Sequence, residues 1–214
     1  MELRQFIDHT LLKATATPED IETLCKEAIE HQFYAVCVNS CYTHLVTTQL
    51  KFERVLVASV VGFPLGAMCA EAKVAEAKEC IEKGADEIDM VINIGFLKAG
   101  LVKSVREEIS AVKEAIGNHV LKVIIETCYL SEEEKIQACE ICEKAGADFV
   151  KTSTGFGTGG ATLEDVALMR KTLGPHMKIK ASGGITTGKE ALLFIAAGAS
   201  RIGTSNGIHL INTQ

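Results

Sequence analysis

The sequence of 214 residues predicts an α/β protein that folds as a single (β/α)8 barrel over residues 1–214. Two observations predict this fold. A helical pattern that ends at a glycine, followed by a short turn and a β-branched run, recurs around Gly84, Gly146 and Gly198. Strand-like runs also alternate with helical patterns along the chain, which is typical of parallel sheets with right-handed crossovers. An open doubly wound sheet is the alternative, but its dinucleotide-binding form is disfavoured because no Gly-x-Gly-x-x-Gly follows the first strand.

Eight strand-like segments follow one another along the chain, and helical patterns fill the intervals. The first long helix should begin at Thr17, because threonine is a favoured N-cap and Pro18 suits the first helical position. The three repeated glycines should end the helices before the fourth, sixth and eighth strands, because a left-handed residue permits a tight turn there. The expected strands are residues 5–9, 35–39, 56–62, 87–93, 121–127, 149–153, 178–183 and 201–204.

Composition excludes several classes of protein. The 22 basic and 28 acidic side chains give a net charge of −6, which disfavours nucleic-acid or anionic-membrane partners. No apolar run approaches the roughly 18 residues of a membrane span, and the polar N-terminus lacks a signal-peptide core. Most of the eight cysteines lie in apolar stretches, as reduced thiols do. We therefore expect a cytoplasmic protein with no nucleic-acid or membrane partner.

Charged side chains fall on the strand face that should point into the barrel. Side chains alternate between faces along a strand, so the apolar positions of residues 87–93 should pack on helices while Asp89 points inward. A buried charge costs several kcal/mol unless it is paired, so a group of them favours a functional cluster over a purely structural ion network. The inward charges expected from this alternation are Asp89, Lys122, Glu126, Lys151 and Lys180.

Two of these lysines predict a covalent mechanism. Lys151 and Lys180 lie on neighbouring strands, about 4.8 Å apart, where mutual repulsion should let one of them lose its proton. A neutral lysine attacks a carbonyl to form a Schiff base, and Asp89 could then act as general acid and base. This is class I aldolase chemistry, which requires no metal or cofactor. The six histidines form no ligand-like pair, so we expect no metal site.

Glycine-rich segments follow the last three strands and predict a phosphate site. Barrel enzymes often bind phosphate after strands seven and eight, where glycines let backbone N–H groups approach an anion. The segment after strand six adds a glycine-rich loop that could approach a ligand closely. The candidate binding residues are Thr154, Gly155, Gly183, Gly184, Gly203, Thr204 and Ser205.

Five blocks in this order and spacing resemble the deoxyribose-phosphate aldolase family: residues 7–12, 87–93, 121–127, 149–156 and 178–185. The resemblance covers nearly the whole chain. It implies a TIM barrel and reversible cleavage of 2-deoxy-D-ribose 5-phosphate to acetaldehyde and D-glyceraldehyde 3-phosphate, in the catabolism of deoxyribonucleotides. It also implies that the partners of the protein are small phosphorylated sugars and aldehydes.

The resemblance assigns roles to individual residues. Lys151 is similar to the Schiff-base lysine, Lys180 to the second lysine that lowers its pKa or shuttles protons, and Asp89 to the proton donor and acceptor, acting through water. Gly183, Gly184 and Ser205 match phosphate contacts, while Asp8, Lys122 and Cys37 match supporting positions. Two features depart from some relatives: Phe156 stands where they have a lysine, and the last residues, 211–214, contain no tyrosine.

Two other functions fit the same barrel. One is another Schiff-base phosphosugar aldolase or a phosphosugar isomerase, and the paired lysines favour the aldolase. The other is a sugar-phosphate-binding protein without activity, for which the inward charges would be structural only. A homodimer or higher homo-oligomer is expected from the frequency of symmetric assemblies.

Overall fold

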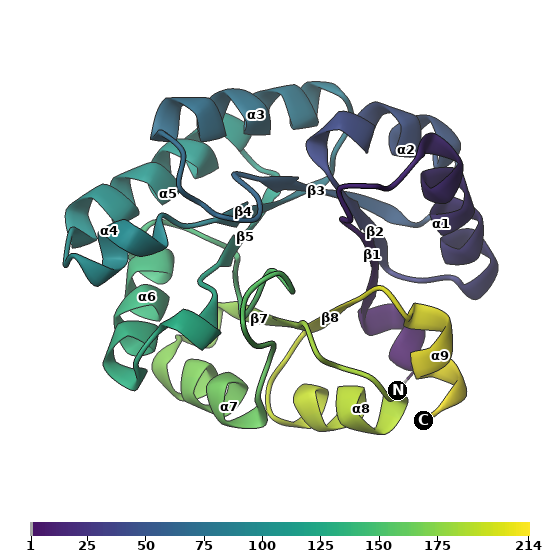
Figure 1. Ribbon diagram of the computed structural model, residues 1–214. Coiled ribbons are helices and arrows are strands. Elements are labelled where there is room, and N and C mark those ends of the chain that lie inside the picture. Colours follow the sequence, from purple (N-terminus) through teal and green to yellow (C-terminus); the bar gives the residue numbers. More distant parts are fainter. Residues whose placement is uncertain (1) are drawn as a thin grey trace.

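The fold was analysed in a computed structural model that describes residues 2–214. Eight parallel strands form a closed barrel in which each strand pairs with the next and the last pairs with the first (Figure 1). The strands are β1 (Ile7–Leu11), β2 (Ala35–Val38), β3 (Leu56–Val61), β4 (Glu87–Val91), β5 (Val120–Ile124), β6 (Phe149–Lys151), β7 (Lys178–Ser182) and β8 (Arg201–Thr204). The predicted (β/α)8 barrel is therefore confirmed.

Helices surround the barrel and leave its centre to the strands (Figure 1). The longer ones are α1 (Pro18–His31), α3 (Ala70–Glu82), α5 (Val102–Ile116), α6 (Glu132–Lys144), α7 (Leu163–Thr172) and α8 (Gly188–Ala196). The shorter ones are α2 (Thr43–Gln49), α4 (Ile94–Lys98), α9 (Gly207–Asn212) and the 3-10 turns η1 (Leu3–Phe6), η2 (Ser40–Tyr42) and η3 (Thr127–Tyr129). No helix in the described part of the chain is long and apolar enough to cross a membrane.

Local sequence signals fix the helix ends. The Thr17 hydroxyl accepts a hydrogen bond from Asp20 N, and Thr17 N donates to the Asp20 carboxylate, so α1 begins with the expected cap followed by Pro18. Gly84, Gly146 and Gly198 all have positive φ angles, between 84° and 116°. The repeated glycines therefore supply the left-handed residues that the turns into β4, β6 and β8 require.

Several strand boundaries differ from those expected. The first strand starts at Ile7 rather than at residue 5, because residues 3–6 form η1 instead. The fourth strand ends at Val91, because Asn93 caps α4 by accepting a hydrogen bond from Phe96 N at 3.0 Å. The fifth ends at Ile124, before Glu126 adopts a left-handed conformation with a φ of 53°. Capping and backbone conformation, rather than hydropathy, set these ends.

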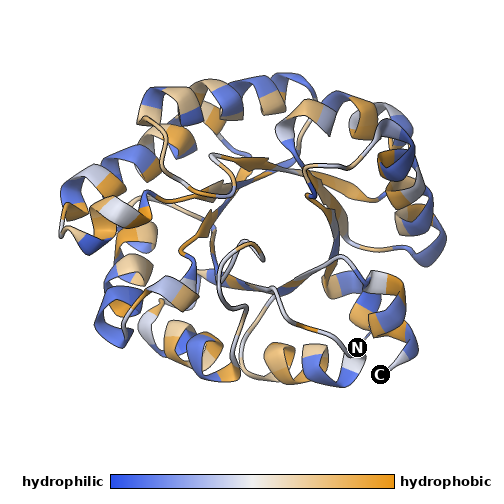
Figure 2. Ribbon diagram, in the orientation of Figure 1, coloured by the Kyte–Doolittle hydropathy of each residue, from blue (hydrophilic) through white to orange (hydrophobic). Residues whose placement is uncertain are grey.

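The main core lies between the barrel and the helices, where apolar strand side chains meet apolar helix faces. Figure 2 shows mainly hydrophobic strands and helices that alternate between hydrophobic and hydrophilic faces. A second, small apolar cluster of Leu12, Cys37, Ala58 and Val60 comes from β2, β3 and the end of β1, with Phe63 packed against it. These residues form a cluster separate from the main core.

Candidate active site

Asp89 lies at the centre of a buried ionic cluster. Its Oδ1 is 2.7 Å from Lys122 Nζ, and its Oδ2 is 2.8 Å from both Lys151 Nζ and Lys180 Nζ. All four side chains are buried. The β-sheet register explains the meeting, since Asp89 on β4 pairs with Lys122 on β5, and Lys151 on β6 pairs with Lys180 on β7. The alternation of side chains along the strands therefore correctly predicted that these four point into the barrel.

A second layer of charges supports this cluster. Asp8 on β1 lies 2.5 Å from Lys180 Nζ and also accepts from Arg201 Nε at 2.7 Å. Glu87 lies 2.6 Å from Lys122 Nζ and accepts from Arg201 Nη1 at 3.2 Å. Together the two layers hold four cations and three carboxylates. The barrel thus has a local excess of positive charge in a chain whose net charge is −6.

Sequence reasoning missed Glu87 and Arg201. A signal for Glu87 was present, because it precedes Asp89 by two residues on the same strand and therefore shares its face. Arg201 begins β8 and pairs in register with Lys180, so it too lies on the inward face. Its guanidinium carbon also lies 3.6 Å from the centre of the Tyr34 ring. Arg201 connects the two acidic side chains of the second layer.

Asp89 and Lys180 keep their charges despite burial. Burial opposes ionisation of Asp89, yet Lys122, Lys151 and Lys180 hold its pKa well below the ordinary value. Burial also opposes a charge on Lys180, but the carboxylates of Asp8 and Asp89 raise its pKa above that of a free lysine. The two carboxylates therefore outweigh the neighbouring cations at Lys180.

Glu126 does not join the ionic cluster, contrary to the expectation from alternation. Its left-handed conformation ends the strand pattern, and its carboxylate instead accepts hydrogen bonds from the backbone and hydroxyl of Thr154. The Thr154 hydroxyl in turn accepts from Phe156 N at 3.0 Å. Glu126 therefore fixes the start of the glycine-rich loop after β6, which curls inward over the barrel opening in Figure 1.

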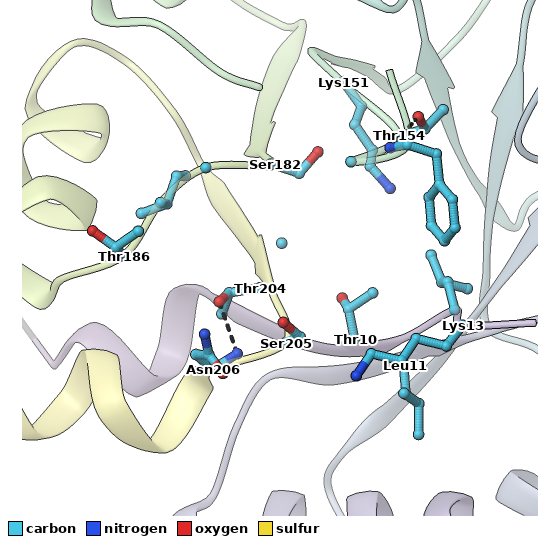
Figure 3. Close-up of a pocket in the computed structure, with 17 residues that line it drawn as sticks. Thr10, Leu11, Lys13, Lys151, Thr154, Ser182, Thr186, Thr204, Ser205 and Asn206 are labelled. Atoms are coloured by element: carbon cyan, nitrogen blue, oxygen red, sulfur yellow. Dashed lines mark hydrogen bonds between the residues drawn. The ribbon is translucent and has the colours of Figure 1, made fainter. Parts of the chain in front are cut away.

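A cavity of about 340 Å³ opens above the cluster. Of the three clustered lysines, only Lys151 lines it. All seven candidate binding residues line it as well: Thr154, Gly155, Gly183, Gly184, Gly203, Thr204 and Ser205. In the view of Figure 3, Lys151 and Thr154 lie at the top of the cavity and Thr10, Lys13 and Ser205 at the bottom. The sequence did not single out Thr10, Lys13, Ser182 or Asn206, which also line it.

The remaining supporting residues lie beneath the cavity. The Cys37 sulfur is 4.0 Å from Asp89 Oδ2, within the apolar cluster of β2 and β3. Burial raises the pKa of the Cys37 thiol, which favours its protonated form. Lys122 belongs to the ionic cluster and Asp8 pairs with Lys180, but neither lines the cavity. Within residues 2–214, no group of three or more His, Cys, Asp or Glu could hold a metal ion.

Comparison with known families identifies the chain. The model of the DeoC/LacD family aldolases matches residues 3–210. The chain belongs to the DeoC/LacD aldolase family. A deoxyribose-phosphate aldolase from Finegoldia magna is 59% identical over 99% of each chain. A crystal structure of a putative deoxyribose-phosphate aldolase from Coccidioides immitis has a TM-score of 0.96 and 41% identity, covering 99% of this chain and 85% of that one. An Aeropyrum pernix deoxyribose phosphate aldolase, described as tetrameric, has a TM-score of 0.90 and 35% identity, covering 98% and 89%.

Phe156 gives this DeoC/LacD aldolase an aromatic contact at the barrel rim. The ring of Phe156 meets that of Phe63 edge to face, with centroids 5.3 Å apart. Phe156 comes from the loop after β6 and Phe63 from the loop after β3, so the contact joins two loops on the barrel rim. Phe156 also lines the cavity, and its wall is therefore apolar at this point.

The ionic cluster makes the stability of this aldolase sensitive to acid. Burial opposes ionisation of Asp8, yet Arg201 and Lys180 hold its pKa at about 2, below the ordinary 3.8. A carboxyl group with a lowered folded pKa contributes stability above pH 3.8 and loses it as the pH falls toward 2, here about 2 kcal/mol. Urea unfolding at pH 6, 4 and 3 should show this decline. An unchanged free energy of unfolding between pH 6 and 3 would contradict it.

Proposed function

We propose that this chain is a class I aldolase that reversibly cleaves 2-deoxy-D-ribose 5-phosphate to acetaldehyde and D-glyceraldehyde 3-phosphate. The observation that carries the proposal is Lys151, whose Nζ lies 2.8 Å from Asp89 and which alone among the three clustered lysines lines the cavity. The names of the relatives support the same substrate. The reaction belongs to the catabolism of deoxyribonucleotides.

Lys151 carries the covalent chemistry. Its neutral amine adds to the C1 aldehyde of the open-chain sugar. The carbinolamine takes up a proton and loses water to give an iminium ion. A base removes the proton of the C3 hydroxyl, the C2–C3 bond breaks, and its electron pair moves to the iminium to form an enamine. D-glyceraldehyde 3-phosphate leaves with C3 as its aldehyde carbon. Protonation of the enamine at C2, followed by hydrolysis, releases acetaldehyde and restores the lysine.

Asp89 and Lys180 are placed to move protons for this sequence. Asp89 is ionised and binds both Lys151 and Lys180 through the same oxygen, so a proton can pass between the lysines through it. A water molecule would connect this relay to the reacting carbons. Lys122 and Asp8 hold the relay in place, the first through Asp89 and the second through Lys180.

The direct test is the release of acetaldehyde from 2-deoxy-D-ribose 5-phosphate by the purified protein, assayed with and without EDTA. We expect equal rates in both, because the proposed electron sink is the iminium ion and not a metal. Formation of a ketose phosphate in place of acetaldehyde would indicate an isomerase. Tight substrate binding without turnover would indicate a sugar-phosphate-binding protein.

The glycine-rich end of the cavity should bind the substrate's phosphate, so an acidic side chain there should weaken binding. Ser205→Asp places a negative charge on the exposed cavity residue after β8. Because like charges repel, we expect KM for 2-deoxy-D-ribose 5-phosphate to rise by at least about tenfold. Borohydride trapping of acetaldehyde should be unaffected, because acetaldehyde has no phosphate. An unchanged KM would place the phosphate elsewhere.

We further propose a cytoplasmic homo-oligomer, a dimer or larger, whose residues 1–214 form one domain. The tetramer described for the Aeropyrum pernix relative supports an oligomer. Analytical ultracentrifugation measures the assembly directly, and a single cooperative unfolding transition would agree with one domain.

A further inference from the structure

Lys13 is the charged residue at the cavity that the proposed mechanism leaves unused. It follows β1 by two residues, its side chain is exposed, and it lines the same cavity as Lys151. In Figure 3 it lies with Thr10 and Ser205 on the side of the cavity away from Lys151. It therefore lies at the side of the cavity that the end of β1 and the loop after β8 form.

The backbone that carries Lys13 is held firmly at the barrel rim. Leu12 is buried in the apolar cluster of β2 and β3, and its carbonyl accepts a hydrogen bond from Asn39 Nδ2 at 3.3 Å. The lysine side chain leaves this anchored point with four flexible methylene groups and a terminal ammonium. It can therefore follow an anion across the cavity mouth without movement of the strand beneath it.

No acidic side chain among the described residues that line the cavity would compete with an anionic ligand for Lys13. Among the described residues that line it, only Lys13 and Lys151 carry a charge, and no acidic side chain does. Lys151 is buried and paired with Asp89, and in the proposed reaction it becomes covalently bound to the substrate. A phosphate monoester carries between about 1.5 and 2 negative charges at neutral pH. The glycine N–H groups and the hydroxyls of Thr204 and Ser205 offer hydrogen bonds but no compensating charge.

We infer that Lys13 is the counter-ion of the substrate's phosphate and sets the preference for phosphorylated over unphosphorylated sugars. This inference rests on the proposed function. Charge-assisted hydrogen bonds are stronger than neutral ones, so the ammonium adds affinity that the glycine-rich loops alone would not supply. It also gives the approaching anion a positive target at the mouth of a protein whose net charge is −6.

The test compares Lys13→Met with Lys13→Arg and with Lys26→Met, which removes another exposed lysine on the outer helix α1. For Lys13→Met we expect KM for 2-deoxy-D-ribose 5-phosphate to rise about 10- to 100-fold with little change in kcat. The kinetics with unphosphorylated 2-deoxy-D-ribose should stay unchanged. Lys13→Arg should recover most of the affinity, and Lys26→Met should behave as the unaltered protein does.

Binding of inorganic phosphate, followed by isothermal titration calorimetry, gives a readout that does not depend on turnover. We expect weaker binding to Lys13→Met than to the unaltered protein, and a smaller dependence of that binding on ionic strength. An unchanged KM, or an equal rise in KM for both sugars, would overturn the assignment of Lys13. If the unaltered protein releases no acetaldehyde at all, the proposed function fails instead, and phosphate titration still decides the role of Lys13.

Discussion

Lys151→Ala is expected to abolish turnover, with a loss on the order of 10⁴-fold or more in kcat, because Lys151 is the lysine of the cavity that contacts Asp89. In the unaltered protein, acetaldehyde and borohydride should attach a two-carbon adduct to Lys151, found by mass spectrometry of the peptides. The Lys151→Ala protein should acquire no such adduct. An adduct on any other lysine in the unaltered protein would refute the assignment.

Lys180→Met provides the matched control for this experiment. It removes an ammonium group bound to the same oxygen of Asp89, but from a side chain that does not line the cavity. We expect this variant to turn over slowly while adduct formation at Lys151 persists. The folded state of both variants can be checked by thermal unfolding, because Asp89 retains two cationic partners in each. If both variants lose the borohydride adduct to the same extent, the experiment does not distinguish Lys151 from Lys180 as the nucleophile, and the assignment to Lys151 alone fails.

Asp89→Asn is expected to have the largest combined effect on stability and activity. The carboxylate binds three buried ammonium groups. An amide of the same shape leaves Lys151 without a carboxylate, while Lys122 keeps only Glu87 and Lys180 keeps only Asp8. Removing one partner from a buried ion pair costs about 3–5 kcal/mol, which corresponds to a fall in Tm of roughly 10 °C for a chain of this size. Urea unfolding measures the first quantity and calorimetry the second. Turnover should fall as well, because the proton relay loses its central member.

A double variant separates the two effects of Asp89. Adding Lys122→Met to Asp89→Asn removes one of the three cations that lose the Asp89 carboxylate, so part of the lost stability should return while activity should not. Glu140→Gln serves as the exposed control, because its ion pair with Lys144 is open to solvent and should contribute less than about 1 kcal/mol. If Asp89→Asn lowers the free energy of unfolding by less than about 1 kcal/mol, the stability of the cluster does not depend on this carboxylate.

Much of the site was predictable from sequence because the charged side chains alternate with apolar ones along the strands. Asp89, Lys122, Lys151 and Lys180 each stand in a short strand whose neighbouring residues are apolar and buried, so alternation alone assigns their direction. The glycine-rich loops were predictable for a similar reason, because a barrel places the loops after its strands at one end. All seven candidate residues, which come from these loops and from the end of β8, line the cavity.

Other features of the site depend on three-dimensional geometry that no short stretch of the sequence indicates. Glu126 follows the alternation of β5 in sequence, but its left-handed backbone turns the side chain toward Thr154. No pattern in the sequence indicated that Asp8 contributes a second carboxylate to Lys180, which raises the pKa of that lysine. Nor did the sequence single out Lys13, since an exposed lysine after a strand is common on any protein surface.

The sequence by itself determined the barrel, the inward direction of the four central charges and the loops that line the cavity, because each follows from periodicity and turn chemistry over a few residues. Only the tertiary structure decided which charges neutralise one another. Asp8 and Arg201 are separated by 193 positions along the chain, and they meet because β8 closes the barrel against β1. Closure is a property of all eight strands together, and electrostatic pairing depends on distances that only closure sets.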